Sequence, residues 1–96
     1  MLEITRKDNV VTLVGRFDAS QEKAAYAVLD TLEESSVIDF KGLEYISSIG
    51  LGVLLKTQKR LSDSGGSLKL INLNPHIWQV FDYARFDLIF DMEKAP

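Results

Sequence analysis

Short runs rich in leucine and β-branched residues alternate along this chain with longer segments whose apolar residues recur at helical spacing. Such runs predict strands, because branched side chains pack well on a pleated surface. They lie at residues 2–5, 10–14, 37–40, 67–71 and 87–90, the last being a short strand or an extended tail. Turn-forming residues follow the first run at Asp8-Asn9, which predicts a hairpin, and the third run at Lys41-Gly42. The alternation favours an α/β fold, a layered domain with a mixed four- to five-stranded sheet and about three helices.

Three amphipathic stripes predict the helices of this domain. The first helix is expected to run from a cap at Asp18 or Ser20 to about residue 34. The second is expected over residues 48–62. The third should open at Asn74-Pro75, because proline is favoured in the first turn of a helix. The aromatic residues near the C-terminus are expected in the core, namely Trp78, Phe81, Tyr83 and Phe86.

The bulk properties of the chain narrow the kind of protein further. Its 96 residues support one compact core, so we expect a single domain over residues 1–96. A formal net charge of −3 and scattered Lys and Arg residues argue against nucleic acid as a partner. No apolar run approaches the ~20 residues of a membrane span, and the N-terminus lacks the apolar core of a signal peptide. We therefore expect a cytoplasmic protein that does not insert into membranes.

Residues suited to catalysis are sparse. The single histidine, His76, follows a proline at a helix start, and no serine or cysteine lies near it in sequence. There is no cysteine and no cluster of metal-ligating residue types. The fourteen carboxylates offer no pair that stands out as acid and base, and the phosphate-binding glycine loop followed by Lys is absent. We expect a protein that is not an enzyme and holds no metal or cofactor.

One segment stands out as a candidate functional site. Two hydroxyls, Ser47 and Ser48, precede the Gly50-x-Gly52 step and an apolar run at helical spacing. The first N–H groups of a helix lack partners within the helix, and the macrodipole is positive there. A serine at this point either caps the helix or presents a hydroxyl to a phosphate donor or a partner protein. The glycines remove side-chain bulk, which would let a partner approach closely.

The segment over residues 37–55 resembles the central motif of STAS domains, in particular the stand-alone anti-sigma factor antagonists of bacteria. In that family a strand ending in Asp and a turn with Gly lead to an Ile-Asp-Ser-Ser/Thr-Gly-Leu-Gly segment and an apolar helix. Asp39 matches the strand-end Asp and Gly42 the turn. The glycine step at residues 50–52 matches as well, and it aligns the family's phosphorylatable serine with Ser48.

The resemblance covers nearly the whole chain, with two departures. Residues 15–20 resemble the family's entry to its first helix, and residues 74–90 resemble its closing helix and tail. Ser47 stands where the family has Asp, and Ile49 stands where it has Ser or Thr. The first departure removes a carboxylate beside the phosphorylatable serine.

The resemblance implies a protein-binding module controlled by phosphorylation at Ser48. It implies docking onto an anti-sigma factor that is also a serine kinase of the histidine-kinase-like type, with release of a sigma factor and resetting by a serine phosphatase. Asp39 would support the docking surface, which would consist of Asp18, Ala19, Ser20, Ser47, Ser48, Ile49, Gly50, Leu51 and Gly52. A second possibility stays open, a constitutive STAS subunit of an ABC-type lipid transport system that uses this surface without a phosphorylation switch.

Overall fold

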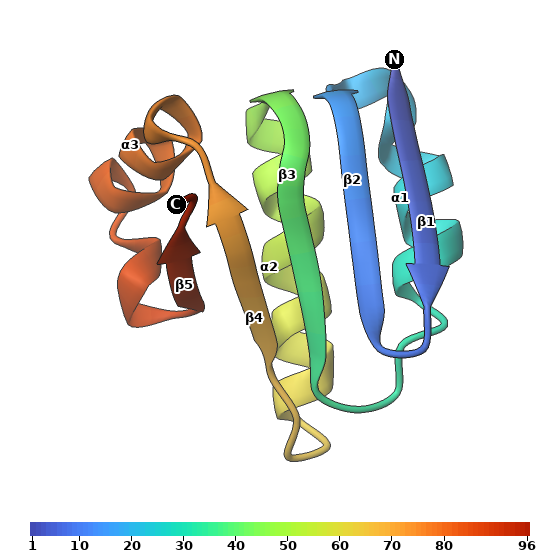
Figure 1. The fold of residues 1–96 in the computed structure, drawn as a ribbon. Coiled ribbons are helices and arrows are strands. Elements are labelled where there is room, and N and C mark those ends of the chain that lie inside the picture. The colour runs from blue at the N-terminus through green and yellow to red at the C-terminus, as the bar shows by residue number, and fades with distance from the viewer.

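A computed structural model describes the whole chain, residues Met1–Pro96, and shows a five-stranded sheet with three α-helices (Figure 1). The strands are β1 (Leu2–Lys7), β2 (Val10–Phe17), β3 (Ser36–Ile46), β4 (Leu68–Leu73) and β5 (Asp91–Lys94). They lie side by side in chain order. The β1–β2 pair is antiparallel, as the expected hairpin requires, and the other three pairs are parallel. The mixed α/β sheet is therefore confirmed.

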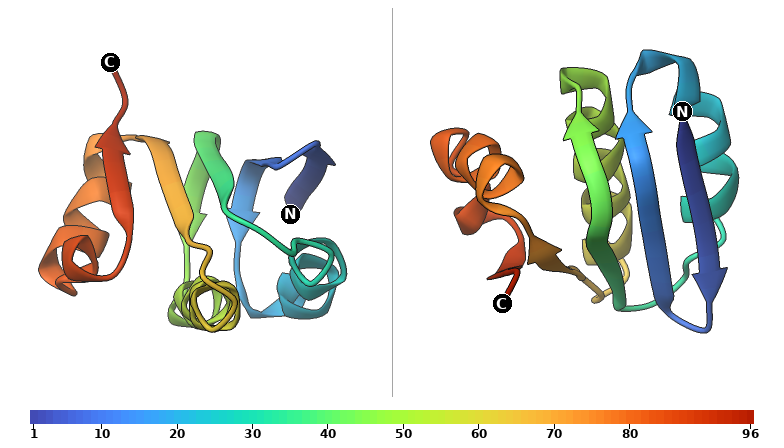
Figure 2. Two further views of the ribbon diagram at one scale, coloured as in Figure 1. Left: turned by 90° about the horizontal axis from the view of Figure 1, so that it is seen from below. Right: turned by 45° about the horizontal axis from the view of Figure 1, so that its top comes forward.

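The helices cover one face of the sheet and leave the other face open (Figure 2). They are α1 (Glu22–Leu29), α2 (Ser48–Ser62) and α3 (Pro75–Tyr83). A single cluster of 19 buried hydrophobic residues fills the space between helices and sheet. Phe81 of α3 lies in this cluster, with its ring edge-to-face with Phe40 of β3 at a centroid distance of 5.6 Å. All three helices thus bury their apolar stripes on the same core.

The first helix is shorter than its stripe indicated. Asp18 caps a 3₁₀ turn, η1 (Ala19–Gln21), and α1 follows this turn and ends at Leu29 rather than near residue 34. Leu32 is fully buried beyond the end of the helix. The segment after α1 has an irregular conformation, and the guanidinium of Arg6 holds it by donating a hydrogen bond to the carbonyl oxygen of Thr31 at 2.8 Å. Tertiary contacts therefore override the helical periodicity here.

The expected turn at Lys41-Gly42 is wrong, because β3 continues through it to Ile46. The pairing of β3 with β2 shifts twice in this stretch, which marks two β-bulges. Gly42 serves a close approach between strands: a Cβ atom at this position would lie 2.9 Å from Cγ2 of Val14. The glycine of the motif is thus a strand residue with a steric reason to lack a side chain.

The C-terminal segment also differs from the expectation. Residues 86–88 form a 3₁₀ turn, η2 (Phe86–Leu88), and the last strand is Asp91–Lys94 rather than residues 87–90. Arg85 adopts the left-handed conformation with φ of 62°, which redirects the chain after α3. Phe81 and Phe86 pack as expected, but Tyr83 is 93% exposed, because it lies on the outer side of α3. Of the four aromatic residues expected in the core, Phe81 is fully buried, Trp78 and Phe86 pack partly buried against the core, and Tyr83 lies outside it.

Candidate functional site at the start of α2

The junction of β3 and α2 separates the two serines by role. Ser47 is the N-cap of α2, in the extended conformation, and its Oγ accepts a hydrogen bond from the Gly50 N–H at 3.2 Å. Its carbonyl oxygen accepts the first bond of the helix from the Leu51 N–H at 3.0 Å. Ser48 is the first helical residue and is exposed. The cap is therefore Ser47, and the Ser48 hydroxyl faces solvent at the positive end of the helix.

A second loop follows β2 and is held by Asp18. Its Oδ1 accepts hydrogen bonds from the Ser20 hydroxyl at 2.6 Å and from the Ser20 N–H at 2.9 Å. The bond from the Ser20 hydroxyl, and next the one from its N–H, lower the pKa of Asp18 from its ordinary value of 3.8, so the side chain is anionic at neutral pH. The Asp18 N–H in turn donates to Oε1 of Gln21 at 3.1 Å. This capping box was not anticipated, although the Asp18-x-x-Gln21 spacing is its signature.

A hydrogen bond between backbone groups joins the two loops. The Ser47 N–H donates to the Phe17 carbonyl oxygen at 2.8 Å, immediately before Asp18. Phe17 and Ile46 are paired at the ends of β2 and β3, so both loops emerge at the same edge of the sheet, the upper edge in Figure 1. The structure thus brings together the two segments that the sequence suggested as one surface, residues 18–20 and 47–52.

The two glycines of the step have different surroundings. Gly50 is buried, and a Cβ atom there would lie 2.8 Å from Ile46 Cγ1 and 3.1 Å from Phe17 Cγ. Its role is to let α2 pack closely on the sheet, and it does not form part of the accessible surface. A Cβ atom on Gly52 would meet nothing within 4 Å. Gly52 is therefore open to a partner.

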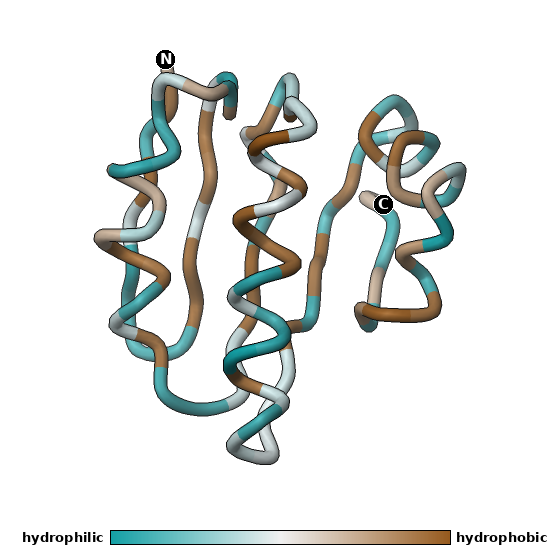
Figure 3. Tube along the Cα trace, turned by 180° about the vertical axis from the view of Figure 1, so that it is seen from behind, coloured by the Kyte–Doolittle hydropathy of each residue, from teal (hydrophilic) through white to brown (hydrophobic).

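The accessible part of this surface is largely uncharged. Ile49 is 40% exposed and Leu51 is half-buried. From Ser47 through Leu55 no residue carries a charge, and the basic residues of α2 begin at Lys56. Figure 3 shows the same division, with apolar residues toward the start of α2 and hydrophilic ones toward its end. Among residues 18–20 and 47–52, Asp18 is the residue that carries a charge.

Asp39 lies away from these loops, in the middle of β3. Its Oδ1 accepts hydrogen bonds from the Lys41 N–H at 2.9 Å and from Nδ2 of Asn72 in β4 at 3.0 Å. Any support that Asp39 gives to the surface therefore acts through the strand.

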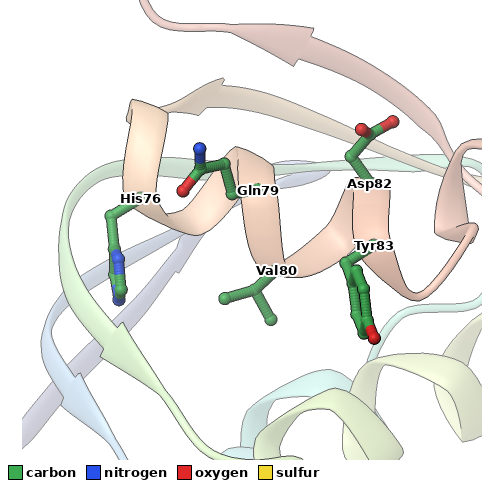
Figure 4. A pocket seen from close by; sticks show the side chains of 5 residues that line it. All are labelled: His76, Gln79, Val80, Asp82 and Tyr83. Carbon is green, nitrogen blue, oxygen red and sulfur yellow. The ribbon is translucent and has the colours of Figure 1, made fainter.

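The single histidine of the chain lines a shallow hollow on the outer side of α3. The hollow is lined by His76, Gln79, Val80, Asp82 and Tyr83 (Figure 4). The lining offers no serine or cysteine nucleophile beside the histidine. Nowhere in the chain do three His, Asp or Glu side chains converge as a metal site would require. No helix is both long and apolar enough to cross a membrane.

The family of the chain follows from comparison with known proteins. The family model described as "Mlab, STAS domain" matches residues 1–91. The chain belongs to the STAS domain family, as the motif at residues 37–55 indicated.

Individual relatives share most of their length with it. BtrV of Bordetella bronchiseptica, provisionally named an anti-sigma factor antagonist, is 39% identical over 84 residues, which cover 86% of this chain and 72% of BtrV. The anti-sigma-B factor antagonist of Bacillus subtilis is 33% identical over 88 residues, covering 88% of this chain and 81% of that protein. The solved structure of the Bacillus cell fate determinant SpoIIAA in its phosphorylated form shares the fold, with a TM-score of 0.72 at 19% identity, covering 100% of this chain and 92% of that one.

Proposed function

We propose that this protein is an anti-sigma factor antagonist whose docking is switched off by phosphorylation of Ser48. The observation that carries the proposal is that the two serines at the start of α2 have different structural roles. Ser47 makes the capping bond, which leaves the exposed Ser48 hydroxyl without a structural task. Two relatives at 39% and 33% identity carry the name of anti-sigma factor antagonist, and a solved structure of this fold is a phosphorylated one.

In this proposal the unphosphorylated protein binds an anti-sigma factor and thereby releases a sigma factor. The docking surface comprises residues 18–20 and the accessible residues at the start of α2, Ser47, Ser48, Ile49, Leu51 and Gly52. The apolar side chains of Ile49 and Leu51 would lie against the partner, and Gly52 would let it approach the helix backbone. The protein acts in the cytoplasm, and it carries no catalytic group of its own.

The anti-sigma factor is proposed to be a serine kinase of the histidine-kinase-like type, and it supplies the ATP and the metal. Transfer of the phosphoryl group to Ser48 adds about −1.5 to −2 charges at pH 7. This charge would lie on the uncharged part of the docking surface, close to the loop of the anionic Asp18, so docking would require desolvation of the phosphate. The same charge sits at a helix N-terminus, which favours anions, so the fold itself tolerates the phosphate. A serine phosphatase would restore docking.

The test is phosphorylation by the cognate kinase with ATP, followed by mapping of the phosphate by mass spectrometry. One phosphate on Ser48 is expected, and Ser48→Ala should take up none while still binding the kinase. Ser47→Ala is the matched control, because it removes the neighbouring hydroxyl and should leave phosphorylation at Ser48 intact. Phosphate found only on Ser47, Ser20 or Thr57 would contradict the assignment.

A second candidate function is a constitutive subunit of an ABC-type lipid transport system. It is favoured by the neutral Ser47 cap, which stands where the family's phosphorylated members have Asp beside the phosphoserine. Capture of partners by the purified protein distinguishes the two. Recovery of an ABC-type ATPase whose binding is insensitive to Ser48→Asp would support this second function, and recovery of a kinase would support the first.

A further inference from the structure

We propose that Asp39 is a positioning residue that holds the first β-bulge of β3 and so determines where Ser47 emerges beside Asp18. The structural part of this inference stands on the geometry of β3, and only its consequence for docking rests on the function proposed above. The bulge lies in the middle of the sheet, far along the strand from the serines.

The register between β2 and β3 shows how much the bulges displace the strand. Thr12 pairs with Asp39, and Phe17 pairs with Ile46, so β2 advances five residues while β3 advances seven. The first extra residue lies at Phe40-Lys41, where two residues of β3 face one of β2. The second lies next to Glu44, between the pairs of Gly15 and Arg16.

Without these bulges Phe17 would pair with Glu44 rather than with Ile46. The Ser47 N–H would then lie two residues beyond the Phe17 carbonyl oxygen that now accepts its hydrogen bond at 2.8 Å. The bulges also keep Phe40, Leu43 and Ile46 in the core at intervals of three residues. Strict alternation from Phe40 would turn Leu43 to the open face. The position of the serine loop therefore depends on two extra residues upstream.

The Asp39 carboxylate is the side chain that holds the first bulge. Its Oδ1 accepts from the N–H of Lys41, inside the bulge, at 2.9 Å. The same oxygen accepts from Nδ2 of Asn72 in β4 at 3.0 Å. Asn72 is itself in the left-handed conformation, with φ of 60°, where the pairing of β4 with β5 shifts between Leu70 and Leu73. One carboxylate thus joins the irregular points of two neighbouring strands.

The contribution of Asp39 differs from that of the apolar side chains nearby. Asp39 is half-buried and points away from the core that Phe40 and Leu43 fill. Hydrophobic burial favours the native register of the strand as a whole, whereas the carboxylate makes a hydrogen bond to the bulged backbone itself. Its removal should loosen the strand between the bulge and Ser47 more than it loosens the rest of the domain.

The experiment compares Asp39→Ala with Asp39→Asn and with Thr31→Val. Asn retains an Oδ1 that accepts both hydrogen bonds, so it is the conservative rescue. Thr31→Val is the matched control, because it removes the side-chain hydrogen bonds of Thr31 with Arg6 and Val28, on another part of the domain. Hydrogen exchange at the Ser47 N–H is measured by NMR relative to the amides of α1. Binding to the anti-sigma factor is measured on the same samples by calorimetry.

Asp39→Ala should speed exchange at Ser47 about thirtyfold relative to α1, the scale of two lost hydrogen bonds, and should weaken binding. Asp39→Asn should restore both, and Thr31→Val should change the exchange of Ser47 no more than that of α1. Equal acceleration at Ser47 and α1 in Asp39→Ala, or failure of Asn to rescue, would overturn the positioning role. If Asp39→Ala does not fold, Asn72→Gly removes one of the two bonds without disturbing the left-handed backbone, and a smaller acceleration confined to Ser47 is expected.

The two readouts separate this inference from the docking proposal. Faster exchange at Ser47 together with unchanged binding would support the positioning role and contradict the docking surface. Unchanged exchange would overturn the positioning role whatever the affinity.

Discussion

Replacing Ser47 by alanine and replacing Ser48 by alanine at the start of α2 should have different consequences. Ser47→Ala removes the Oγ that accepts from the Gly50 N–H at 3.2 Å. Gly50 is buried, so water reaches the freed N–H poorly. Ser48→Ala removes an exposed hydroxyl that makes no capping bond, and alanine is the better helix former. One substitution should affect stability and the other phosphorylation.

The magnitude follows from the loss of the cap. Replacing a Ser cap by Ala costs about 1 kcal/mol, within a range of roughly 0.5–2 kcal/mol. For a domain of this size 1 kcal/mol lowers the Tm by about 4–8 °C. Ser47→Ala should therefore melt about 4–8 °C below the wild type. Ser48→Ala should melt at the wild-type temperature or slightly above it, because it gains a few tenths of a kcal/mol in helix propensity, at most about 0.7 kcal/mol.

Thermal melts followed by circular dichroism measure the first effect, and phosphoryl transfer from labelled ATP measures the second. Ser47→Ala should still be phosphorylated at a temperature where it is folded, and Ser48→Ala should not be. Ser47→Asp serves as a further control, since Asp caps as well as Ser and its charge suits the helix N-terminus. A large loss of stability in Ser48→Ala with none in Ser47→Ala would refute the assignment of the cap, and the reasoning about the free hydroxyl with it.

Three further outcomes are expected. Ser48→Asp should weaken binding to the anti-sigma factor roughly a hundredfold or more, corresponding to about 2.7 kcal/mol, and equal affinities by calorimetry would contradict the switch. Gly52→Arg should leave the Tm unchanged or raised but impair binding, since Gly52 is open, whereas Leu54→Ala, at a fully buried position, should cost about 2–5 kcal/mol while its folded fraction still binds. Melts and isotherms that reversed this pattern would mean that α2 presents a different face. Asp18→Asn should destabilise the domain most above about pH 4. The ionised Asp18, whose pKa is lowered from 3.8, contributes stability that is complete above this ordinary value and is lost as the pH falls through the lowered one. Urea unfolding at neutral and at acid pH measures the difference between the two proteins, which a pH-independent result would contradict.

Features written in consecutive residues could be predicted from the sequence. The second helix spans Ser48–Ser62 as expected, and the third opens at Asn74-Pro75, where the Asn74 side chain accepts from the Ile77 N–H at 2.9 Å. The hairpin around Asp8-Asn9 is also present, with Asp8 at a φ of 54°. Caps, turns and helical periodicity involve groups a few residues apart, so their chemistry is visible in one dimension.

The composition of the candidate site was only partly visible in the same way. The motif drew attention to Ser48 and to the loop at residues 18–20, and the structure places both at one edge of the sheet. It did not distinguish Gly50 from Gly52, although one packs against Phe17 and the other faces open space. Two glycines of equal appearance in the sequence acquire different roles, because their neighbours come from β2 and β3.

Features that depend on neighbouring strands were decided by the tertiary structure alone. Lys41-Gly42 has the composition of a turn, yet it lies within β3, because pairing with β2 and the bulge beside Asp39 carry the strand through it. The last strand forms at Asp91–Lys94, where β4 offers a free edge, and not at the more apolar residues before it. Local sequence determines which residues favour a helix or a turn. Register and the ends of strands depend on hydrogen bonds to residues far along the chain, and these exist only once the sheet has formed.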